Sequence, residues 1–323
     1  MTNPAAIQSA VRRPEATPAI ALSGLSKTYR GGLRAVDDLT VTVPPGQVIG
    51  LLGPNGAGKT TTIKMIAGLI EPTSGRIRLN GFDVAAERGQ AVRQIGAVLE
   101  GSRNVYWPLS AWQNLLYFGR LKGLRGAEIK PRARRLLTDL GLWGRRGEPV
   151  GSFSRGMQQK VAIAAALITD PPILLLDEPT LGLDVEAART VKNWITKLAR
   201  DEGKTIVLTT HQLDVAQQLS DRTAVIRQGA IIADLPTGEL LARYAEDHFV
   251  VRVAGSLNGV ALPPGATAEP DGDTTRITLT STRTDALCDV LHRLPAAGVS
   301  LVSVSQAQPG LEEIFLRLVG GRR

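Results

Sequence analysis

The chain has 323 residues, of which 43% are hydrophobic and 21% are charged, a composition typical of water-soluble globular proteins. Its length exceeds what one hydrophobic core usually supports, and it suits two unequal domains. The longest uninterrupted apolar run, residues 161–168, is far shorter than the ~20 residues that a membrane-spanning helix needs, and no secretion signal is recognisable. The single cysteine, Cys288, excludes an internal disulfide framework and a multi-cysteine metal site, so we expect a cytosolic chain.

The formal net charge of +8 is compatible with a nucleic acid, an anionic membrane surface or a phosphorylated ligand. Basic side chains crowd residues 120–135, where only Glu128 opposes them. Two interpretations of this stretch stay open, a solvated helical face and a surface near anionic lipid head groups.

Secondary-structure patterns divide the chain into a leader and an α/β domain. Residues 1–18 are rich in Pro and Ala without periodicity, and they predict a flexible leader. From residue 19 to about residue 235, short apolar runs alternate with helical patterns, which predicts an α/β domain. The clearest predicted strands cover residues 47–52, 95–99, 173–177, 205–209 and 224–227, and the clearest predicted helices cover residues 60–69 and 185–200.

A glycine-rich segment directly follows the first of these strands. It has the P-loop pattern, in which two glycines enclose four residues before Lys and Thr, over Gly53, Pro54, Asn55, Gly56, Ala57, Gly58, Lys59 and Thr60. Glycines let backbone N–H groups turn toward phosphate oxygens, and the start of the following helix favours an anion. Lys59 would reach the β- and γ-phosphates, and the Thr60 hydroxyl would bind Mg²⁺. The segment therefore predicts a triphosphate site, with a purely structural turn as the alternative.

Two carboxylates, Asp177 and Glu178, end the apolar run at residues 173–176. In α/β sheets, ligands bind at this carboxyl edge of the strands. Asp177 suits holding the hydration shell of Mg²⁺, and Glu178 suits orienting and deprotonating an attacking water. The alternative is a solvated strand end.

A smaller domain is predicted beyond a linking helix at residues 236–247. Residues 248–323 alternate as strands and repeat as helices, which predicts a small α+β domain. The stretch 262–273 is rich in Pro, Gly and Asp and predicts a loop. Cys288 falls on the apolar side of a predicted helix, so we expect it in the core rather than reactive.

The order of these motifs resembles that of ABC-type ATPases. Between the P-loop and Asp177 lies FSRGMQQK, residues 153–160, which is similar to the family signature Leu-Ser-Gly-Gly-Gln. It opens a helical run with Ser154 as the N-cap, a second anion-binding helix start. The resemblance implies that Ser154 and Gly156 complete the nucleotide site of another cassette in a head-to-tail dimer. Arg155 and Met157 are part of this signature but depart from the consensus.

The resemblance also assigns roles by position. Tyr29 matches the aromatic residue that stacks on adenine, and Thr61 extends the nucleotide-binding set. Asp184 falls in the loop that acts across the dimer. His211 matches the histidine that holds the γ-phosphate and the catalytic carboxylate, so Glu178 and His211 are the expected catalytic residues.

One position departs from the family in a way that affects metal binding. Glu100 stands where the family carries Gln, and it would add a third carboxylate near Asp177 and Glu178. Such an acid favours a bound Mg²⁺ and repels a metal-free triphosphate. The expected metal residues are therefore Thr60, Glu100 and Asp177.

The resemblance covers about residues 19–235 and implies a P-loop cassette with a mixed sheet core, an antiparallel β subdomain and a helical subdomain, followed by the small α+β domain. It implies an ATPase that uses ATP and Mg²⁺ and energises transport through a separate transmembrane permease when two copies close. The implied partners are that permease and a second cassette, and no nucleic acid is expected. Patterns at residues 100–115 and 309–321 are similar to cassettes exporting drugs, lipids or polysaccharides. Such a subunit is cytoplasmic and peripheral, reaching the membrane only through its permease.

Two other functions compete with transport. One is an ABC-type ATPase that acts on ribosomes or DNA, but its translation-factor form carries two cassettes and its DNA-repair form a long coiled coil, and neither pattern occurs here. The other is a GTPase switch, which would need an Asn-Lys-x-Asp motif that the sequence lacks.

Overall fold

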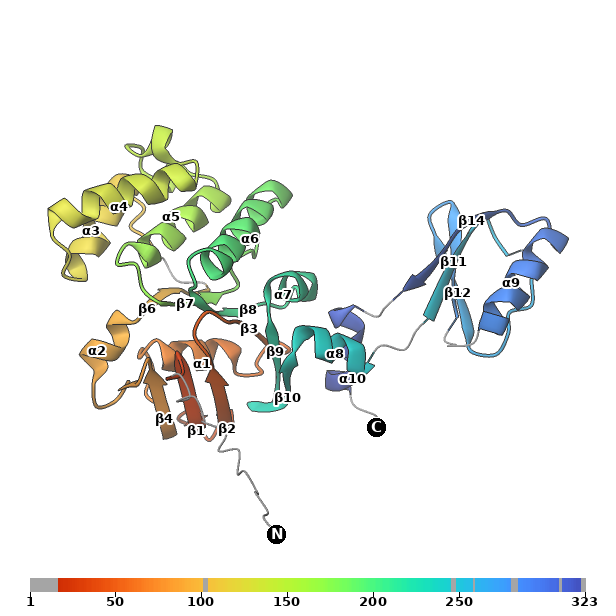
Figure 1. The fold of residues 1–323 in the computed structure, drawn as a ribbon, viewed down its shortest axis with the longest axis horizontal. Helices are drawn as coiled ribbons and strands as arrows, with labels where there is room; N and C mark the ends of the chain where they lie inside the picture. Colours follow the sequence, from red (N-terminus) through yellow and green to blue (C-terminus); the bar gives the residue numbers. More distant parts are fainter. Residues whose placement is uncertain are drawn as a thin grey trace, which may run out of the picture.

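The computed structural model describes residues 17–100, 104–244, 248–257, 259–279, 284–307 and 310–320. The expected leader, except for residues 17 and 18, lies outside the described residues. The described chain contains three sheets, two in the amino-terminal part and one in the carboxy-terminal part (Figure 1). This α/β architecture confirms the predicted fold class.

A six-stranded sheet forms the centre of the amino-terminal part. Its strand order is β10-β9-β3-β8-β7-β6, and all neighbouring pairs are parallel except β9 with β10. Strands β3, β7 and β8 are buried on both faces, which agrees with their continuous apolar sequences. The strands cover Val48–Leu52 (β3), Ile95–Val98 (β6), Ile173–Asp177 (β7), Thr205–Thr209 (β8), Arg222–Arg227 (β9) and Ala230–Pro236 (β10). All five predicted strands are present.

An antiparallel sheet lies beside the central one, with strand order β2-β1-β4-β5. It comprises Ile20–Thr28 (β1), Arg34–Val43 (β2), Ser74–Leu79 (β4) and Phe82–Asp83 (β5). Its apolar face shares one core with helix α1, Lys59–Ile66, and with one face of the central sheet. Helix α2, Arg88–Arg93, packs at the edge of the same core.

Helices cover the other face of the central sheet (Figure 1). They are α3 (Ala111–Leu121), α4 (Gly126–Asp139), α5 (Arg155–Leu167), α6 (Val185–Arg200) and α7 (Leu213–Leu219), with 3₁₀ turns η1 (Trp143–Arg145) and η2 (Val150–Ser152). The basic stretch falls on α3, α4 and their connection, where most of its charged side chains point to solvent. Trp112 packs edge-on against Trp143 at 5.7 Å between ring centroids, as part of this helical core.

The carboxy-terminal sheet has the order β12-β13-β11-β14 and is antiparallel throughout. It comprises His248–Ala254 (β11), Ala266–Asp271 (β12), Thr274–Leu279 (β13) and Leu301–Ala307 (β14), and helix α9, Thr284–Ala296, covers one face. The sheet and α9 enclose a small core of their own.

Two sequence expectations for this region are wrong. Residues 262–273 are not wholly a loop, because β12 pairs with β13 through a two-residue turn in which Gly272 has φ +60°. A glycine at the first position of such a turn is a hairpin signal. Cys288 is exposed, because the buried stripe of α9 runs through Leu287, Val290 and Leu294 and turns Cys288 away from the sheet.

The last helix leaves this small domain and returns to the amino-terminal part. Helix α8, Thr237–Tyr244, follows β10, and helix α10, Leu311–Gly320, packs against both α7 and α8 (Figure 1). Leu311 and Ile314 are buried there in a cluster with Leu52, Ala216 and Leu240. The small sheet domain is therefore tied at both ends to elements that pack on the central sheet.

Candidate functional site

The P-loop connects β3 to α1 and has a backbone that only glycine fits at two positions. A Cβ on Gly53 would lie 2.4 Å from the Ile226 carbonyl oxygen. Gly58 has φ +104°, and a Cβ there would lie 2.3 Å from the Ala35 carbonyl oxygen. Close packing against β2 and β9 thus fixes the loop shape in front of the helix start, where an anion is favoured.

Lys59 is buried at the first position of α1, and its ammonium group lies over the loop. Its Nζ donates to the carbonyl oxygens of Gly53 at 2.6 Å and Pro54 at 3.1 Å. Burial lowers the pKa of Lys59, while the negative charges of Glu178, Asp177 and Glu100 act in the opposite direction and raise it. Burial outweighs the carboxylates, so the pKa of Lys59 lies below its ordinary value.

Asp177, at the end of β7, has the oxygen chemistry expected of a magnesium site. It is 2% exposed, and its Oδ1 accepts hydrogen bonds from the hydroxyls of Thr209 and, at 3.4 Å, Thr60. Its Oδ2 is buried and has no hydrogen-bond partner among the described residues. A buried, unpaired carboxylate oxygen beside a hydroxyl fits a hard cation such as Mg²⁺.

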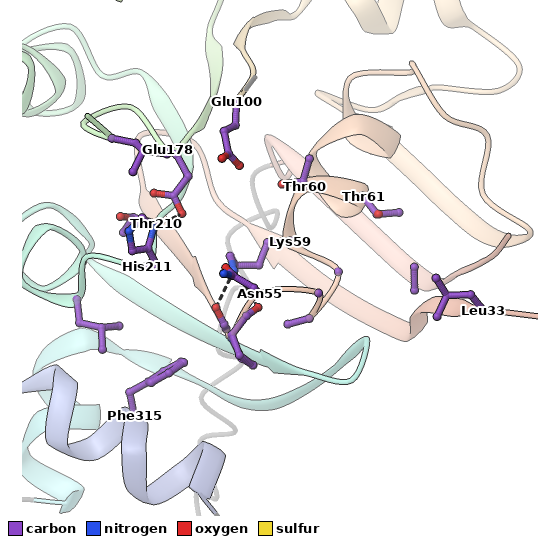
Figure 2. Close-up of a pocket in the computed structure, with 18 of the residues that line it drawn as sticks. Leu33, Asn55, Lys59, Thr60, Thr61, Glu100, Glu178, Thr210, His211 and Phe315 are labelled. Atoms are coloured by element: carbon purple, nitrogen blue, oxygen red, sulfur yellow. Dashed lines mark hydrogen bonds and ion pairs between the residues drawn. The ribbon is translucent and has the colours of Figure 1, made fainter. Parts of the chain in front are cut away.

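Glu100 belongs to the same site but does not complete a metal cage. It lines the cavity across from Lys59 (Figure 2). Within the described part of the chain, no three His, Cys, Asp or Glu side chains gather closely enough to hold a metal by themselves. A magnesium ion at Thr60 and Asp177 would therefore take its remaining ligands from phosphates and water, as Mg²⁺ commonly does.

Glu178 is held in an unusual backbone conformation beside His211. It has φ +52°, a region that costs a residue other than glycine about 1–3 kcal/mol. Its Oε1 lies 2.9 Å from His211 Nδ1, its side chain is 7% exposed, and its Oε2 is buried without a partner among the described residues. The carboxylate therefore has one oxygen paired with His211 and one that is unpaired and shielded from solvent, while the residue itself lines the cavity.

These groups line one cavity of about 720 Å³ (Figure 2). Leu33 lies toward one end and Phe315 toward the other, with Lys59 and Thr60 of the P-loop between them, and Tyr29 and Leu213 also line the cavity. The Tyr29 hydroxyl is 3.4 Å from Thr61 Oγ1, and its ring is partly exposed, so a flat ring system can stack on it. The cavity thus joins an aromatic wall, an anion-binding loop and a carboxylate–histidine pair.

The signature segment forms a helix start, but it lies elsewhere. Ser154 caps α5, and its Oγ accepts a hydrogen bond from the Met157 N–H at 3.3 Å. Gly156 packs so closely on α6 that a Cβ there would lie 2.6 Å from the Ala187 Cβ. The described residues that line the cavity include none of residues 154–157. The serine-capped helix start therefore does not serve the cavity of its own chain.

Two signature residues that depart from the consensus have local partners. The Arg155 guanidinium lies against Gly182, in the loop between β7 and α6. The Met157 sulfur accepts a hydrogen bond from Arg145 Nη1 at 3.3 Å. Asp184 ends the same loop as the N-cap of α6, and its Oδ1 accepts from the Ala187 N–H at 2.7 Å. The signature and the 181–184 loop therefore form one continuous surface.

Thr209, Leu213 and Phe315 are among the contributors to this site that sequence reasoning missed. Thr209 is the donor that holds Asp177, and its place at the end of a predicted strand could have indicated it. Leu213 lies two residues after His211 in the cavity wall. Phe315 also lines the cavity, although it lies far away in the sequence, and no local pattern predicts that α10 returns to this site.

Comparisons with known proteins agree with this geometry. A family model described as "ABC transporter" matches residues 36–181. The daunorubicin/doxorubicin resistance ATP-binding protein DrrA of Streptomyces peucetius is 38% identical over 310 residues, which cover 94% of this chain and 93% of that protein. The ABC transporter ATP-binding protein NatA of Bacillus subtilis is 43% identical over 200 residues, 62% of this chain and 81% of that protein. A dimeric post-hydrolysis ATP-binding cassette bound to ADP and Pi has a TM-score of 0.62 at 28% identity, covering 68% of this chain and 98% of that chain.

Proposed function

Because the chain belongs to the ABC transporter family of ATP-binding cassettes, we propose that it is the ATPase subunit of an exporter whose permease is a separate chain. Its reaction is hydrolysis of ATP. The observation that carries the proposal is the Glu178–His211 pair beside a P-loop cavity, in a chain whose own signature helix lies outside that cavity.

The site residues divide the reaction between them. Lys59 and the helix start behind it neutralise negative charge on the phosphates, and Tyr29 stacks on the adenine ring. Glu178 orients the water and accepts its proton, while His211 holds its Oε1. Thr60 and Asp177 would hold Mg²⁺, which supplies Lewis-acid stabilisation of the transferring phosphoryl group.

The separation of the signature from the cavity supports a shared site. The start of α5 is an anion-binding element, and the adjoining 181–184 loop presents a further contact surface. A second copy, placed head to tail, would bring its Ser154 over the phosphates of this chain. The solved dimeric cassette at 28% identity supports this assembly. Closing two copies around two nucleotides is then the step that ATP drives.

The membrane connection is indirect in this proposal. No helix in the described part of the chain is long and apolar enough to cross a bilayer. The exposed aromatic residues Tyr106, Trp107 and Tyr117 offer a docking surface on the helical subdomain, next to the basic face of α3 and α4. The subunit would lie on the cytoplasmic side of the membrane, bound to its permease. The drug-resistance role of the Streptomyces relative supports export as the direction.

Co-purification tests this function against action on ribosomes or DNA. The full chain carrying Glu178→Gln is expressed in its native cell, membranes are solubilised with mild detergent, and the complex is captured with ATP present. We expect a polytopic membrane protein that does not co-purify with a Lys59→Ala variant. Recovery of ribosomal proteins or nucleic acid without any membrane protein would contradict transport.

A further inference from the structure

Helix α10 contacts the two segments that the ATP site depends on. Leu311 and Ile314 are 1% and 0% exposed, and they pack in one cluster with Leu52 and Ala216. Leu52 is the residue immediately before the P-loop, and Ala216 belongs to α7. Helix α7 begins at Leu213, two residues after His211. Helix α10 therefore packs against both the segment that leads into the P-loop and the segment that follows His211.

A hydrogen bond fixes the start of α10 to the same element. The Leu311 N–H donates to Gln217 Oε1 at 2.9 Å, and Gln217 lies on α7. The first N–H groups of a helix have no partner inside the helix, so this bond satisfies one of them and sets where α10 begins. Packing and hydrogen bonding thus both tie α10 to the segment that carries His211.

Phe315 extends from α10 into the cavity wall. It is partly buried, packs on the same buried cluster as Leu213, and lines the cavity on the side of His211 (Figure 2). Leu33 and Thr61 lie on the opposite side (Figure 2), and the Tyr29 hydroxyl is 3.4 Å from Thr61 Oγ1. Phe315 is therefore placed to act on the catalytic end of the cavity rather than on adenine.

We propose that Phe315 is a positioning residue for ATP hydrolysis, which holds residues 210–213 so that His211 meets Glu178. The proposal rests on the ATPase activity and adds a structural support from outside the 19–235 cassette. His211 is half-exposed and its Nδ1 lies 2.9 Å from Glu178 Oε1, so the position of residues 210–213 sets the geometry of the pair. Leu213 and Phe315 both pack on the buried cluster that includes Leu52, Ala216 and Ile314, and both line the cavity, so α10 supports the segment through that cluster.

The test uses the full chain with one change at a time. Phe315→Ala removes the support, Phe315→Leu restores an apolar group, and Leu316→Ala alters the neighbouring side chain, which is 63% exposed, as the matched control. Two further variants change Gln217, which does not line the cavity. Gln217→Leu removes the acceptor for the Leu311 N–H, and Gln217→Glu keeps it. Steady-state kcat and KM, binding of a fluorescent ATP analogue, and hydrogen–deuterium exchange are measured for each.

We expect Phe315→Ala to lower kcat on the order of tenfold and to leave nucleotide affinity within about twofold, since a misplaced catalytic group loses rate rather than binding. Amide exchange should accelerate over residues 210–219 and stay unchanged over β1. Phe315→Leu and Leu316→Ala should behave like the unmodified chain, and Gln217→Leu should move in the same direction as Phe315→Ala.

Three results would overturn the proposal. The first is an unchanged kcat in Phe315→Ala. The second is a loss of nucleotide affinity with unchanged kcat, which would make Phe315 a nucleotide contact. The third is a lower kcat without faster exchange over residues 210–219. Absence of ATP hydrolysis in the unmodified chain would instead contradict the proposed function, and the exchange measurement would still decide whether Phe315 supports the histidine segment.

Discussion

Replacing Glu178 by glutamine separates its basicity from its position. The amide keeps an Oε1 that can accept from His211 Nδ1, which lies 2.9 Å away, and it keeps the size of the side chain. It replaces the buried, unpaired Oε2 with an amide group that cannot take a proton from water. Loss of general-base help costs at least ~100-fold in rate, equivalent to about 2.7 kcal/mol of transition-state stabilisation. The free energy of unfolding should change by less than about 0.5 kcal/mol, because the backbone strain at φ +52° is common to both residues.

The assay compares phosphate release at saturating MgATP for the unmodified chain, Glu178→Gln and Glu202→Gln, where Glu202 is an exposed acid that does not line the cavity. Nucleotide binding is measured in parallel and should persist in Glu178→Gln, since Lys59 and the P-loop are intact. A Glu178→Gln protein with more than half the normal rate would refute the role of Glu178 as the base. Loss of binding together with turnover would refute the separation of the two functions.

Three further outcomes are expected. Glu100→Gln should bind metal-free ATP more tightly and depend less on Mg²⁺, and equal Mg²⁺ half-saturation in both proteins would discard the role of the acid. ATP turnover should rise faster than linearly with protein concentration below the dimer dissociation constant, because each site needs Ser154 from another chain; strict proportionality over that range contradicts shared sites. The hydrogen bond from Lys204 lowers the pKa of Asp170 below its ordinary 3.8, so its stabilisation exists above pH 3.8 and is lost as pH falls through the lowered value. Asp170→Asn should therefore lower the free energy of unfolding by about 1 kcal/mol at neutral pH, a figure discounted for the half-exposed carboxylate, and urea titrations should show the gap closing at acidic pH.

The parts of the site that local patterns predict are those built from contiguous residues. The P-loop pattern needs glycines at fixed spacing, and Gly53 and Gly58 indeed pack too closely for any side chain. Asp177 follows a strand whose continuous apolar sequence indicates burial on both faces, so its place at the sheet edge follows from the sequence. His211 is similarly placed after β8, and the structure brings it to Glu178.

The parts that could not be predicted depend on packing between distant segments. Cys288 and Leu287 are neighbours with similar apolar character, and only the angle at which α9 meets the sheet decides which one is buried. The α10 pattern predicts a helix but not its partner, because both the small sheet and α7 could cover an apolar stripe. The expectation of a single domain over residues 248–323 remains a proposal. Within that range, α10 packs against α7 and α8 of the amino-terminal part.

The order of elements along the chain has a consequence for synthesis. Strand β3, the P-loop and His211 are all translated before the small sheet, whereas the helix that carries Phe315 follows that sheet. A nascent polypeptide can therefore assemble most of the ATP cavity early, yet its Phe315 wall arrives only after β11 to β14 have emerged. By the role proposed for Phe315, a chain that has not yet completed α10 would turn over ATP on the order of tenfold more slowly than the finished subunit.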